Sequence, residues 1–528
     1  MRLNRPRTLL SAVLTAGLTA ACGTAGPSTG SGGTLVIGMT ASDIPGTDTV
    51  MAFAHGFEGE RFVNFQLYDG LTRYDLKQST RTPGIVPGLA TSWETSRDGR
   101  TWTFHLRRGV TFSDGTPFDA DSVIFAYDRL LNKKSPYYYP EAAGAAALWS
   151  GQIRSYRKID AGTVEITTKQ PSGHLLTDLT FLTIPSPTAV KKHGNQRFAQ
   201  HPEGTGPFRF ESLKPGQQLT MVPNKNYWGG APKVGKLVLR PIPDAAARTA
   251  ALRSGQVNWI EYPSPDDVAP LRSSGFQLLS NNYDHLWYCT FDQAVKPWND
   301  VRVRRAANYA IDRQAIARDL LKGTADPVHQ HAPASTDQHD PANDAYKHDP
   351  AKAKELLAQA GVPQGFSTTL AVPTGGSGNL IPVPIATALQ AQLAKVGIKV
   401  QIKKVEWSAL LADLNAGKPV QGADVQCAST VTFQAEALVR AYWAKGSPVY
   451  KGHWYSARVD SLSEEAERTL DPVKRVSLYR QAERIVSDEA PYLFVVSDRN
   501  PRALAADVQG LVQPKSWFVD LTTVRVGK

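Results

Sequence analysis

The chain alternates between two kinds of hydrophobic spacing, and this alternation constrains its fold most. Residues 101–107 alternate apolar and polar side chains, with Trp102, Phe104 and Leu106 on one face, which is the two-residue period of a half-buried strand. From Asp119 onward, apolar side chains instead recur at helical spacing, after an aspartate that can cap a helix. Strands that alternate with helices predict an α/β protein.

The same alternation returns in the second half of the chain. Asp349-Pro350 and Gly361 predict the start and the end of a helix, because proline suits the first helical position and glycine follows the last. Residues 380–396 predict another helix, and the alternating residues 398–402 predict the strand after it. With 528 residues, 41% of them hydrophobic, the chain is long enough for two or more domains with large buried cores.

The charge distribution argues against one class of function. Lys and Arg number 59 and Asp and Glu 48, which gives a formal net charge of +11. Acidic residues are interspersed almost everywhere, and no run of five or more Lys or Arg occurs. Because phosphate recognition needs such a concentrated basic surface, we expect no nucleic-acid partner.

The N-terminal segment has the pattern of an export signal. Three arginines precede an uncharged run, residues 8–21, that is shorter than a membrane-spanning helix. The run ends before Cys22 in a pattern that resembles the bacterial lipobox, so residues 1–21 are predicted to be a lipoprotein signal peptide and Cys22 the lipidated residue. Cleavage that leaves Cys22 unlipidated is the alternative, because Thr19 replaces the usual leucine. Residues 22–33 predict a Gly/Ser-rich tether.

Two further cysteines, Cys289 and Cys427, remain in the predicted mature chain. An exported chain meets an oxidising compartment, which favours a disulfide between them over metal ligation or a nucleophilic role. No Cys-x-x-Cys motif occurs. Two buried free thiols are the alternative.

A long motif in residues 89–131 carries a family resemblance. It reads LATSWETSRDGRTWTFHLRRGVTFSDGTPFDADSVIFAYDRLL and resembles the signature of the family 5 extracellular solute-binding proteins. That family supplies the substrate-binding components of ABC importers for peptides, nickel and related solutes. Further motifs follow in the family's order at residues 67–71, 204–208, 224–230, 242–245, 251–255, 301–304, 309–313 and 397–400.

The resemblance implies an α/β fold with two lobes, a periplasmic-binding-protein-like clamshell of type II in its large variant with an extra subdomain. A hinge between the lobes would close them around a ligand. Lobe I would comprise residues 34–285 and 497–528, with the subdomain at about residues 66–185. Lobe II would comprise residues 286–496. The resemblance implies neither catalysis nor a cofactor.

The family pattern also bears on the cysteines and on ligand charge. In the oligopeptide binders a disulfide joins the two matching cysteine positions, so the resemblance implies that Cys289 pairs with Cys427. Two residues beyond the second cysteine, the peptide binders place an aspartate that pairs with the ligand's ammonium group. Ser429 occupies that position here. Because a serine hydroxyl cannot neutralise a buried cation, we expect the ligand's amino end to be held differently or to be absent.

Other candidate ligand-binding residues come from the same resemblance. Val425 and Gln426 belong to a segment, residues 425–428, that we expect to hold an extended peptide by main-chain hydrogen bonds. Trp407 lies where the oligopeptide binders have a pocket tryptophan, which would stack on a ligand side chain. Ordinary core packing is the alternative for Trp407.

One carboxylate is a candidate replacement for the missing aspartate. Glu58 lies in a predicted loop, residues 55–58, at the expected cleft edge of the other lobe. Its carboxylate would supply the charge that Ser429 lacks. A solvated loop is the alternative.

Motifs of other chemistries are absent or misplaced. Residues 26–30 fit the Gly-x-Ser-x-Gly expression, but they lie in the predicted tether and not between a strand and a helix. Residues 375–378, Gly-Gly-Ser-Gly, lack the lysine of a phosphate loop and predict an ordinary loop. The energy for transport must therefore come from a separate ATPase.

Four histidines raise the question of a metal. His329 and His331, with His339 and His348 nearby, are imidazole ligands of the kind that suits nickel. They lie in one segment without an evident supporting partner, so a polar loop is favoured and no metal is predicted.

The sequence therefore predicts a monomeric extracytoplasmic substrate-binding lipoprotein, anchored to the outer face of a bacterial cell membrane or periplasmic. It would deliver a peptide or peptide-like ligand to an ABC permease. The alternatives are a non-peptide ligand such as nickel, a metallophore or a sugar, and a ligand-sensing receptor or exported chaperone that feeds no transporter.

Overall fold

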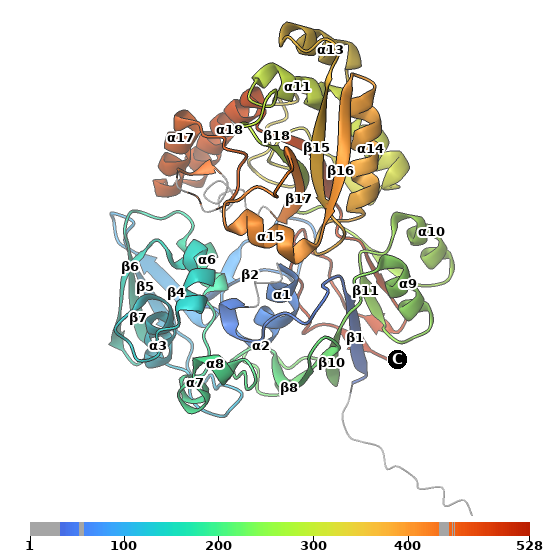
Figure 1. The fold of residues 1–528 in the computed structure, drawn as a ribbon. Helices are drawn as coiled ribbons and strands as arrows, with labels where there is room; N and C mark the ends of the chain where they lie inside the picture. Colours follow the sequence, from blue (N-terminus) through green and yellow to red (C-terminus); the bar gives the residue numbers. More distant parts are fainter. Residues whose placement is uncertain (1–31, 52–56, 432–442, 446, 448, 528) are drawn as a thin grey trace, which may run out of the picture. The chain divides into compact units, whose positions relative to one another are not determined.

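Two large sheets, of seven and six strands, organise the described part of the chain. The structure is a computed structural model that describes residues 32–51, 57–431, 443–445, 447 and 449–527. Residues 32–528 form one compact unit, whose strands and helices are labelled in Figure 1. Strands and helices alternate along it, as the spacing of apolar residues predicts.

The largest sheet has seven strands in the order β12-β19-β11-β1-β10-β9-β8. In chain order its strands are β1 (Thr34–Met39), β8 (Phe208–Lys214), β9 (Gln218–Pro223), β10 (Lys236–Pro241), β11 (Trp259–Glu261), β12 (Gln277–Leu279) and β19 (Arg502–Leu504). The central strand β1 runs parallel to both β10 and β11. The carboxyl ends of these three strands therefore share one edge of the sheet.

A second sheet has six strands in the order β14-β18-β13-β17-β15-β16. Its strands are β13 (His285–Phe291), β14 (Ala325–Pro327), β15 (Phe366–Pro373), β16 (Ile398–Val405), β17 (Val425–Val431) and β18 (Tyr492–Asp498). Here β15 runs parallel to β16 and to β17. The chain enters this sheet between Leu279 and His285, and it returns to the seven-stranded sheet between Asp498 and Arg502.

The smaller sheets are local. A four-stranded antiparallel sheet contains β4 (Ala90–Thr95), β5 (Thr101–Leu106), β6 (Ile153–Asp160) and β7 (Thr163–Thr168). Two-stranded sheets join β2 (Thr72–Tyr74) with β3 (Ile85–Pro87), and β20 (Val508–Gln509) with β21 (Arg525–Val526).

Helices follow or connect these strands (Figure 1). They are α1 (Phe57–Gly59), α2 (Phe65–Leu67), α3 (Ala120–Leu131), α4 (Pro140–Ala145), α5 (Ala147–Ser150), α6 (Leu175–Phe181), α7 (Pro187–His193), α8 (Asn195–Phe198), α9 (Ala245–Arg253), α10 (Pro265–Ser273), α11 (Val301–Ala310), α12 (Arg313–Ala315), α13 (Pro350–Gln359), α14 (Pro382–Ala394), α15 (Trp407–Asn415), α17 (Ala457–Arg468) and α18 (Pro472–Glu489). Two π-helical turns lie at Glu60–Asn64 and Ile316–Leu320.

Local signals explain several of these boundaries. The Asp119 side chain accepts a hydrogen bond of 3.1 Å from the Ser122 N–H at the start of α3, as its capping position predicts. Asp349 caps α13 in the same way, and Gly361 follows that helix with a φ of 81°, a conformation that glycine adopts without strain. The predictions of a strand at 101–107, of helices at 350–361 and 380–396 and of a strand after residue 397 are confirmed.

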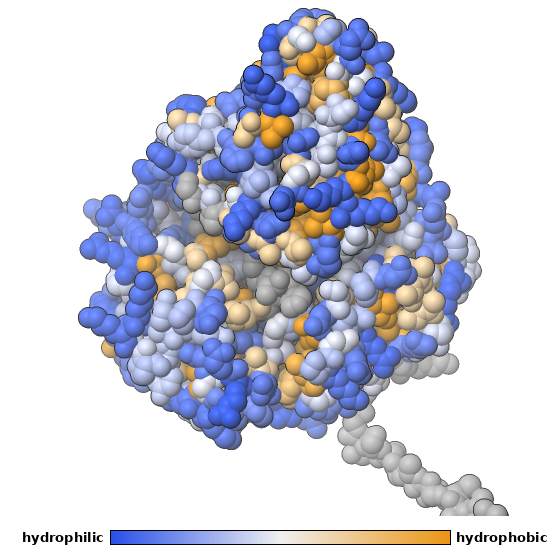
Figure 2. Space-filling view, in the orientation of Figure 1, coloured by the Kyte–Doolittle hydropathy of each residue, from blue (hydrophilic) through white to orange (hydrophobic). Residues whose placement is uncertain are grey.

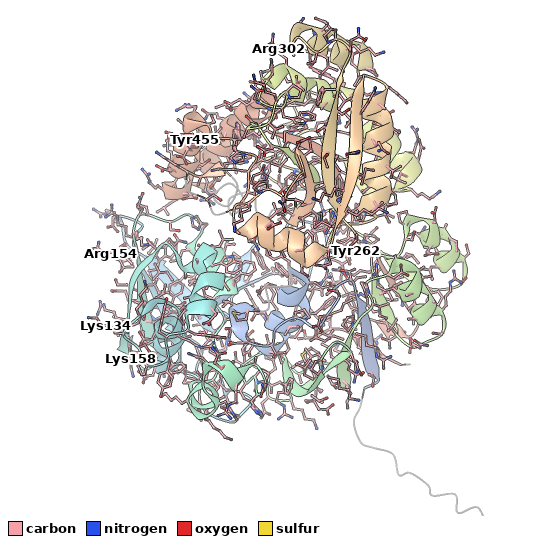
Figure 3. The ribbon with its side chains drawn as sticks, in the orientation of Figure 1. Lys134, Arg154, Lys158, Tyr262, Arg302 and Tyr455 are labelled. Carbon is pink, nitrogen blue, oxygen red and sulfur yellow. A yellow bond between two sulfur atoms is a disulfide. The ribbon has the colours of Figure 1, made fainter. Side chains whose placement is uncertain are left out.

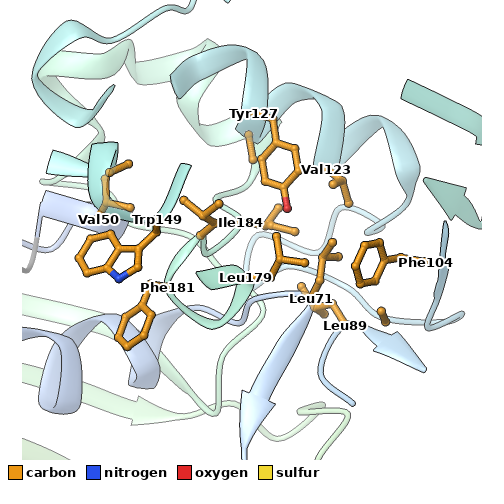
Figure 4. Close-up of a cluster of buried hydrophobic side chains, with 14 of the residues drawn as sticks. Val50, Leu71, Leu89, Phe104, Val123, Tyr127, Trp149, Leu179, Phe181 and Ile184 are labelled. Atoms are coloured by element: carbon orange, nitrogen blue, oxygen red, sulfur yellow. The ribbon is translucent and has the colours of Figure 1, made fainter. Parts of the chain in front are cut away.

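The four-stranded sheet and the two large sheets each have an apolar core. The cluster in Figure 4 packs the four-stranded sheet against α3, α5 and α6, and it includes Phe104, Val123, Trp149 and Phe181. The Trp149 and Phe181 rings stack with centroids 5.0 Å apart. Separate buried clusters surround the six-stranded and the seven-stranded sheets. The burial of these clusters is the main stabilising contribution to the fold.

A disulfide joins Cys289 and Cys427. The two residues face each other on the antiparallel neighbours β13 and β17, and both are fully buried. This bond therefore links two central strands of the six-stranded sheet, and the pairing that the sequence favours is present.

No helix in the described ranges combines the length and the apolar character that crossing a bilayer requires. Figure 2 shows hydrophilic residues over most of the visible face, with apolar residues scattered among them, as on most protein surfaces.

Candidate ligand-binding site

A cavity of about 490 Å³ lies where parallel strands of both large sheets end. From the seven-stranded sheet, the lining residues follow the carboxyl ends of β1, β10 and β11: Thr40, Ser42, Pro243, Asp244, Ala245, Arg248 and Tyr262. From the six-stranded sheet, they follow β15 and β16: Thr374, Gly375, Gly376, Leu380, Ile381, Pro382, Val383, Pro384, Glu406 and Trp407. Ligands of α/β proteins bind outside the carboxyl ends of parallel strands, so this cavity is the candidate site.

Backbone strain marks both sides of the cavity. Tyr262 and Leu380 have φ angles of 47° and 57°, in the left-handed region that bulky residues rarely adopt. Tyr262 follows β11 of the seven-stranded sheet, and Leu380 precedes α14 beside the six-stranded sheet. Such strain clusters at binding sites, where the surrounding structure must hold it in place. Figure 3 labels Tyr262 beside the start of α15.

A buried arginine organises the wall next to the seven-stranded sheet. The Arg248 guanidinium donates hydrogen bonds to the main-chain carbonyls of Ile242, Pro243, Glu261 and Tyr262, at 2.7 to 3.0 Å. Its side chain is buried, and burial lowers its pKa to about 10, so it stays charged at neutral pH. Arg248 thus ties the ends of β10 and β11 together.

A buried ion-pair network lies behind this wall. Glu261 on β11 contacts Arg61 at 2.6 Å and Arg502 at 3.0 Å, and all three side chains are almost fully buried. Although burial opposes ionisation, Arg502 and Arg61 hold the pKa of Glu261 below its usual value. The carboxylate is therefore ionised and paired, as a buried charge requires.

The opposite wall consists of a glycine-rich loop and the first turn of α15. The Glu406 side chain caps α15 by accepting a hydrogen bond of 3.1 Å from the Ala409 N–H. Trp407 packs so closely on Gly376 that a Cβ atom there would lie 2.3 Å from the indole Cγ. The indole N–H of Trp407 has no hydrogen-bond partner among the described residues. In Figure 1, α15 lies between the strands of the six-stranded sheet and helices α1 and α2.

Comparison with known proteins identifies the family. Residues 84–424, more than half of the chain, match the model of the bacterial extracellular solute-binding proteins, family 5. The chain belongs to this family. The dipeptide-binding protein of Escherichia coli strain K12 is 30% identical over 486 residues, which cover 87% of this chain and 90% of the relative. Heme-binding protein A of Haemophilus influenzae is 31% identical over 473 residues, which cover 85% of this chain and 84% of the relative.

A solved structure extends the comparison to the fold. The ABC transporter-associated periplasmic binding protein DppA of Helicobacter pylori, in complex with the peptide STSA, aligns with a TM-score of 0.81 and 26% identity. The alignment covers 94% of this chain and 98% of that structure. This solute-binding protein therefore has the mixed α/β periplasmic-binding-protein fold. As members of this family bind solutes and catalyse no reaction, it is a binder and not an enzyme.

The structure buries Glu58 beside the end of β1, and its contact with a ligand stays a prediction. Its carboxylate is fully buried and accepts hydrogen bonds from the Thr40 N–H (2.9 Å), the Thr40 hydroxyl (2.8 Å) and the Ala41 N–H (2.8 Å). Burial raises the pKa of Glu58, and Arg61 opposes that rise. The Glu58 carboxylate is the acceptor that these main-chain N–H groups at the end of β1 need. Glu58 therefore lies neither in a solvated loop nor in the cavity lining. His55 and Gly56 of the same predicted loop lie outside the described residues.

The structure places Val425 and Gln426 inside the six-stranded sheet, and any contact of their side chains with a ligand stays a prediction. Both residues pair with β13 on one side of β17 and with β15 on the other. Their main-chain groups therefore lie inside the sheet, and no ligand strand can be added there. The sequence predicted this strand, but it could not show that β13 and β15 lie on its two sides.

The other predicted site residues are Trp407, Ser429 and Cys22. Trp407 lies in the cavity lining, and its contact with a ligand stays a prediction. Ser429 is partly buried, but its hydroxyl donates to the Ser377 carbonyl and its N–H donates to the Asn379 side chain, both at 3.1 Å. Contact between Ser429 and a ligand stays a prediction. Cys22 lies outside the described residues, so its lipidation stays a prediction.

The four histidines considered for nickel do not converge. Each ring Nδ1 contacts a different oxygen: His329 the Tyr346 carbonyl, His331 the Glu483 carboxylate, His339 the Ala332 carbonyl and His348 the Asp312 carboxylate. Among the described residues, no group of three or more His, Cys, Asp or Glu side chains is arranged to hold a metal ion.

Sequence reasoning missed the residues that shape the two walls. Arg248, Tyr262 and Asn379 carried no motif that marks a binding residue. Residues 375–378 were recognised only as a loop, although their glycines are a signal for close main-chain approach. That signal, placed shortly before a predicted helix, and the prediction for Trp407 both pointed to this wall.

Proposed function

We propose that this solute-binding protein captures a peptide or peptide-like ligand in the cavity and delivers it to an ABC permease with a separate ATPase. The observation that carries the proposal is a cavity of about 490 Å³ at the carboxyl ends of parallel strands from two different sheets. A cavity between two sheet regions can close around a ligand when one region moves against the other. Relatives named as dipeptide-binding and peptide-complexed proteins support the ligand class.

We further propose two lobes that move about a hinge. Lobe I would comprise residues 34–285 and 497–528, with a subdomain at about residues 66–185, and lobe II residues 286–496. The two passages of the chain between the sheets, Leu279 to His285 and Asp498 to Arg502, are the natural hinge segments because they are short. Closure around these segments would trap the ligand and create the form that a permease recognises.

The proposed location is extracytoplasmic, with a lipid anchor at Cys22. The family model describes extracellular proteins, which supports export. A tether at residues 22–33 would hold the binding unit near the membrane without restricting its orientation. Stable attachment needs the full lipoprotein modification, because a single acyl chain binds membranes only marginally.

The proposal is tested by identifying what the protein retains. The full chain is purified without added ligand, its intact mass is measured under native conditions, and bound molecules are released by denaturation and identified by mass spectrometry. A mixture of short peptides is expected. A single non-peptide compound or a bound metal would contradict the peptide assignment, although it would leave the role of solute binder in place.

A further inference from the structure

The loop from Thr374 to Leu380 touches three functional parts of the molecule at once. It lines the cavity through Thr374, Gly375, Gly376 and Leu380. At Gly376 it abuts the Trp407 indole, and at Gly378 it abuts β17. The position of this loop therefore affects both the cavity wall and the neighbouring strand.

Asn379 holds this loop on β17. The residue is fully buried, and its side-chain oxygen accepts a hydrogen bond of 3.1 Å from the Ser429 N–H. Its side-chain amide donates to the carbonyls of Gly375 (3.1 Å) and Ser377 (3.4 Å). One side chain thus accepts the hydrogen bond from the β17 main chain and fixes the conformation of the loop. Its removal leaves buried polar groups without partners.

The loop occupies an edge that would otherwise accept a strand. β15 pairs with β17 only at Val425 and Gln426, and Pro373 at the end of β15 has no N–H for a further bond. Beyond that point Asn379 takes the place of a neighbouring strand at the Ser429 N–H. An extended peptide that ran along β17 would need this same N–H.

The loop packs closely on β17 and on the start of β13. Gly378 has a φ of 74°, and a Cβ atom there would lie 2.8 Å from His285 Nε2 and 2.9 Å from Ser429 Oγ. The Ser429 hydroxyl also donates to the Ser377 carbonyl, which adds a second bond between strand and loop. A ligand can reach this edge of β17 only if the loop moves away.

We propose that Asn379 is a positioning residue that limits ligand length, because it holds the loop on the edge of β17 along which a longer peptide would extend. The inference rests on the proposed function, namely peptide binding in the adjacent cavity. A short peptide fits the cavity and leaves the loop in place. A longer peptide must displace the loop and break its bonds to Ser429, which lowers its affinity.

The test compares peptides of different length with the full chain and its Asn379→Ala variant. Dissociation constants are measured by calorimetry for dialanine, trialanine, tetra-alanine and penta-alanine. We expect the wild type to bind the shortest peptides best, and the ratio of the penta-alanine to the dialanine constant to fall about tenfold or more in Asn379→Ala. Peptide binding with an unchanged ratio would overturn the length limit alone. Failure of the wild type to bind any of the four peptides would overturn the peptide function and the length limit with it.

A matched control separates positioning from general destabilisation. Asn308 is equally buried and also donates two side-chain hydrogen bonds, to the carbonyls of Arg304 and Tyr492, but it lies on α11. Asn308→Ala should lower thermal stability and leave the ratio unchanged. Amide hydrogen exchange at Ser429 should accelerate about tenfold or more in Asn379→Ala and not in Asn308→Ala, and equal protection in the two variants would overturn the proposal.

A second variant covers the case in which Asn379→Ala does not fold. Gly378→Ala keeps Asn379 and pushes the loop away from β17, since its methyl group would clash with His285. It should lower the ratio in the same direction and also expose the Ser429 amide. An unchanged ratio in this variant would overturn the proposal independently.

Discussion

Both walls of the cavity begin where parallel strands end, β1, β10 and β11 on one side and β15 and β16 on the other. Their chemistry differs. Charged side chains in the interior hold the first wall, with Arg248 on main-chain carbonyls and Glu58 on main-chain N–H groups. Mainly neutral groups hold the second, with one asparagine, one serine and a loop of glycines, while the Glu406 carboxylate caps α15.

This difference in chemistry implies that the wall held by Arg248 is rigid and that the glycine-rich wall is adaptable. Separating a buried charge from its partners is costly, so the charged wall has one strongly preferred arrangement. Neutral hydrogen bonds contribute about 1 kcal/mol each, so the glycine-rich wall can rearrange at modest cost. We therefore expect ligand-dependent changes to occur mainly in the loop from Thr374 to Leu380.

The largest expected effect concerns the disulfide, which lies only on the neutral side. Reduction, or the double variant Cys289→Ala and Cys427→Ala, releases a constraint between residues 138 positions apart. In the chain-entropy model this lowers the free energy of unfolding by about 5 kcal/mol. Denaturant titration with and without reductant measures the loss. Amide exchange should accelerate in β13 and β17 more than in β1 and β10, and uniform acceleration would contradict the assignment of the effect to one sheet.

The next largest effect concerns the charged wall. Arg248→Ala removes the donor from four main-chain carbonyls, two of them buried, and should lower the free energy of unfolding by about 3 kcal/mol. Arg302→Ala is the control, because that side chain is 46% exposed and pairs with Asp300 at the surface (Figure 3). The control should change stability little, because exposed ion pairs contribute little. Similar losses in the two variants would show that Arg248 has no special role.

A smaller effect depends on pH. Glu60 is fully buried, one of its carboxylate oxygens has no hydrogen-bond partner among the described residues, and burial raises its pKa from 4.5 to about 8. The folded state then binds a proton that the unfolded state loses, so stability falls as pH rises from about 5 to about 8. The free energy of unfolding of Glu60→Gln should exceed that of the wild type by about 2 kcal/mol at pH 6, with little difference at pH 4.5.

Denaturant titration at the two pH values measures this dependence. Glu94→Gln is the control, since that side chain is 81% exposed and should show no such difference. A pH-independent gap between Glu60→Gln and the wild type would refute the raised pKa.

The smallest change in stability is expected at Trp407, on the adaptable wall. Trp407 is only partly buried, so Trp407→Leu should lower the free energy of unfolding by about 1 kcal/mol. Peptide affinity should fall about tenfold if the indole stacks on the ligand, which calorimetry measures. Trp93→Leu is the control, because Trp93 is a partly buried tryptophan on β4 that packs beside Phe104. Unchanged affinity in Trp407→Leu would assign Trp407 to packing alone.

The sequence predicted individual helices and strands better than it predicted the contacts of the site residues. The caps of α3 and α13 and the alternation in β5 and β16 rest on contacts between residues close in the chain, so local patterns predicted them. Glu58 could not be interpreted locally, because its partners at Thr40 and Ala41 depend on where β1 ends in the folded sheet. The pairing of Val425 and Gln426 with strands on both sides could not be predicted for a similar reason, because the order of strands decides which edges are free.

By itself, the sequence determined the alternation of strands and helices, the family and the candidate cysteines, because periodicity, caps and motifs are properties of neighbouring residues. The tertiary structure alone decided which strand ends meet at the cavity and which polar groups are already engaged there. Arg248 and Asn379 acquire their roles from carbonyls and N–H groups that other segments bring to them. A hydrogen bond depends on position and direction in space, and the linear order of residues does not specify either of them across long separations.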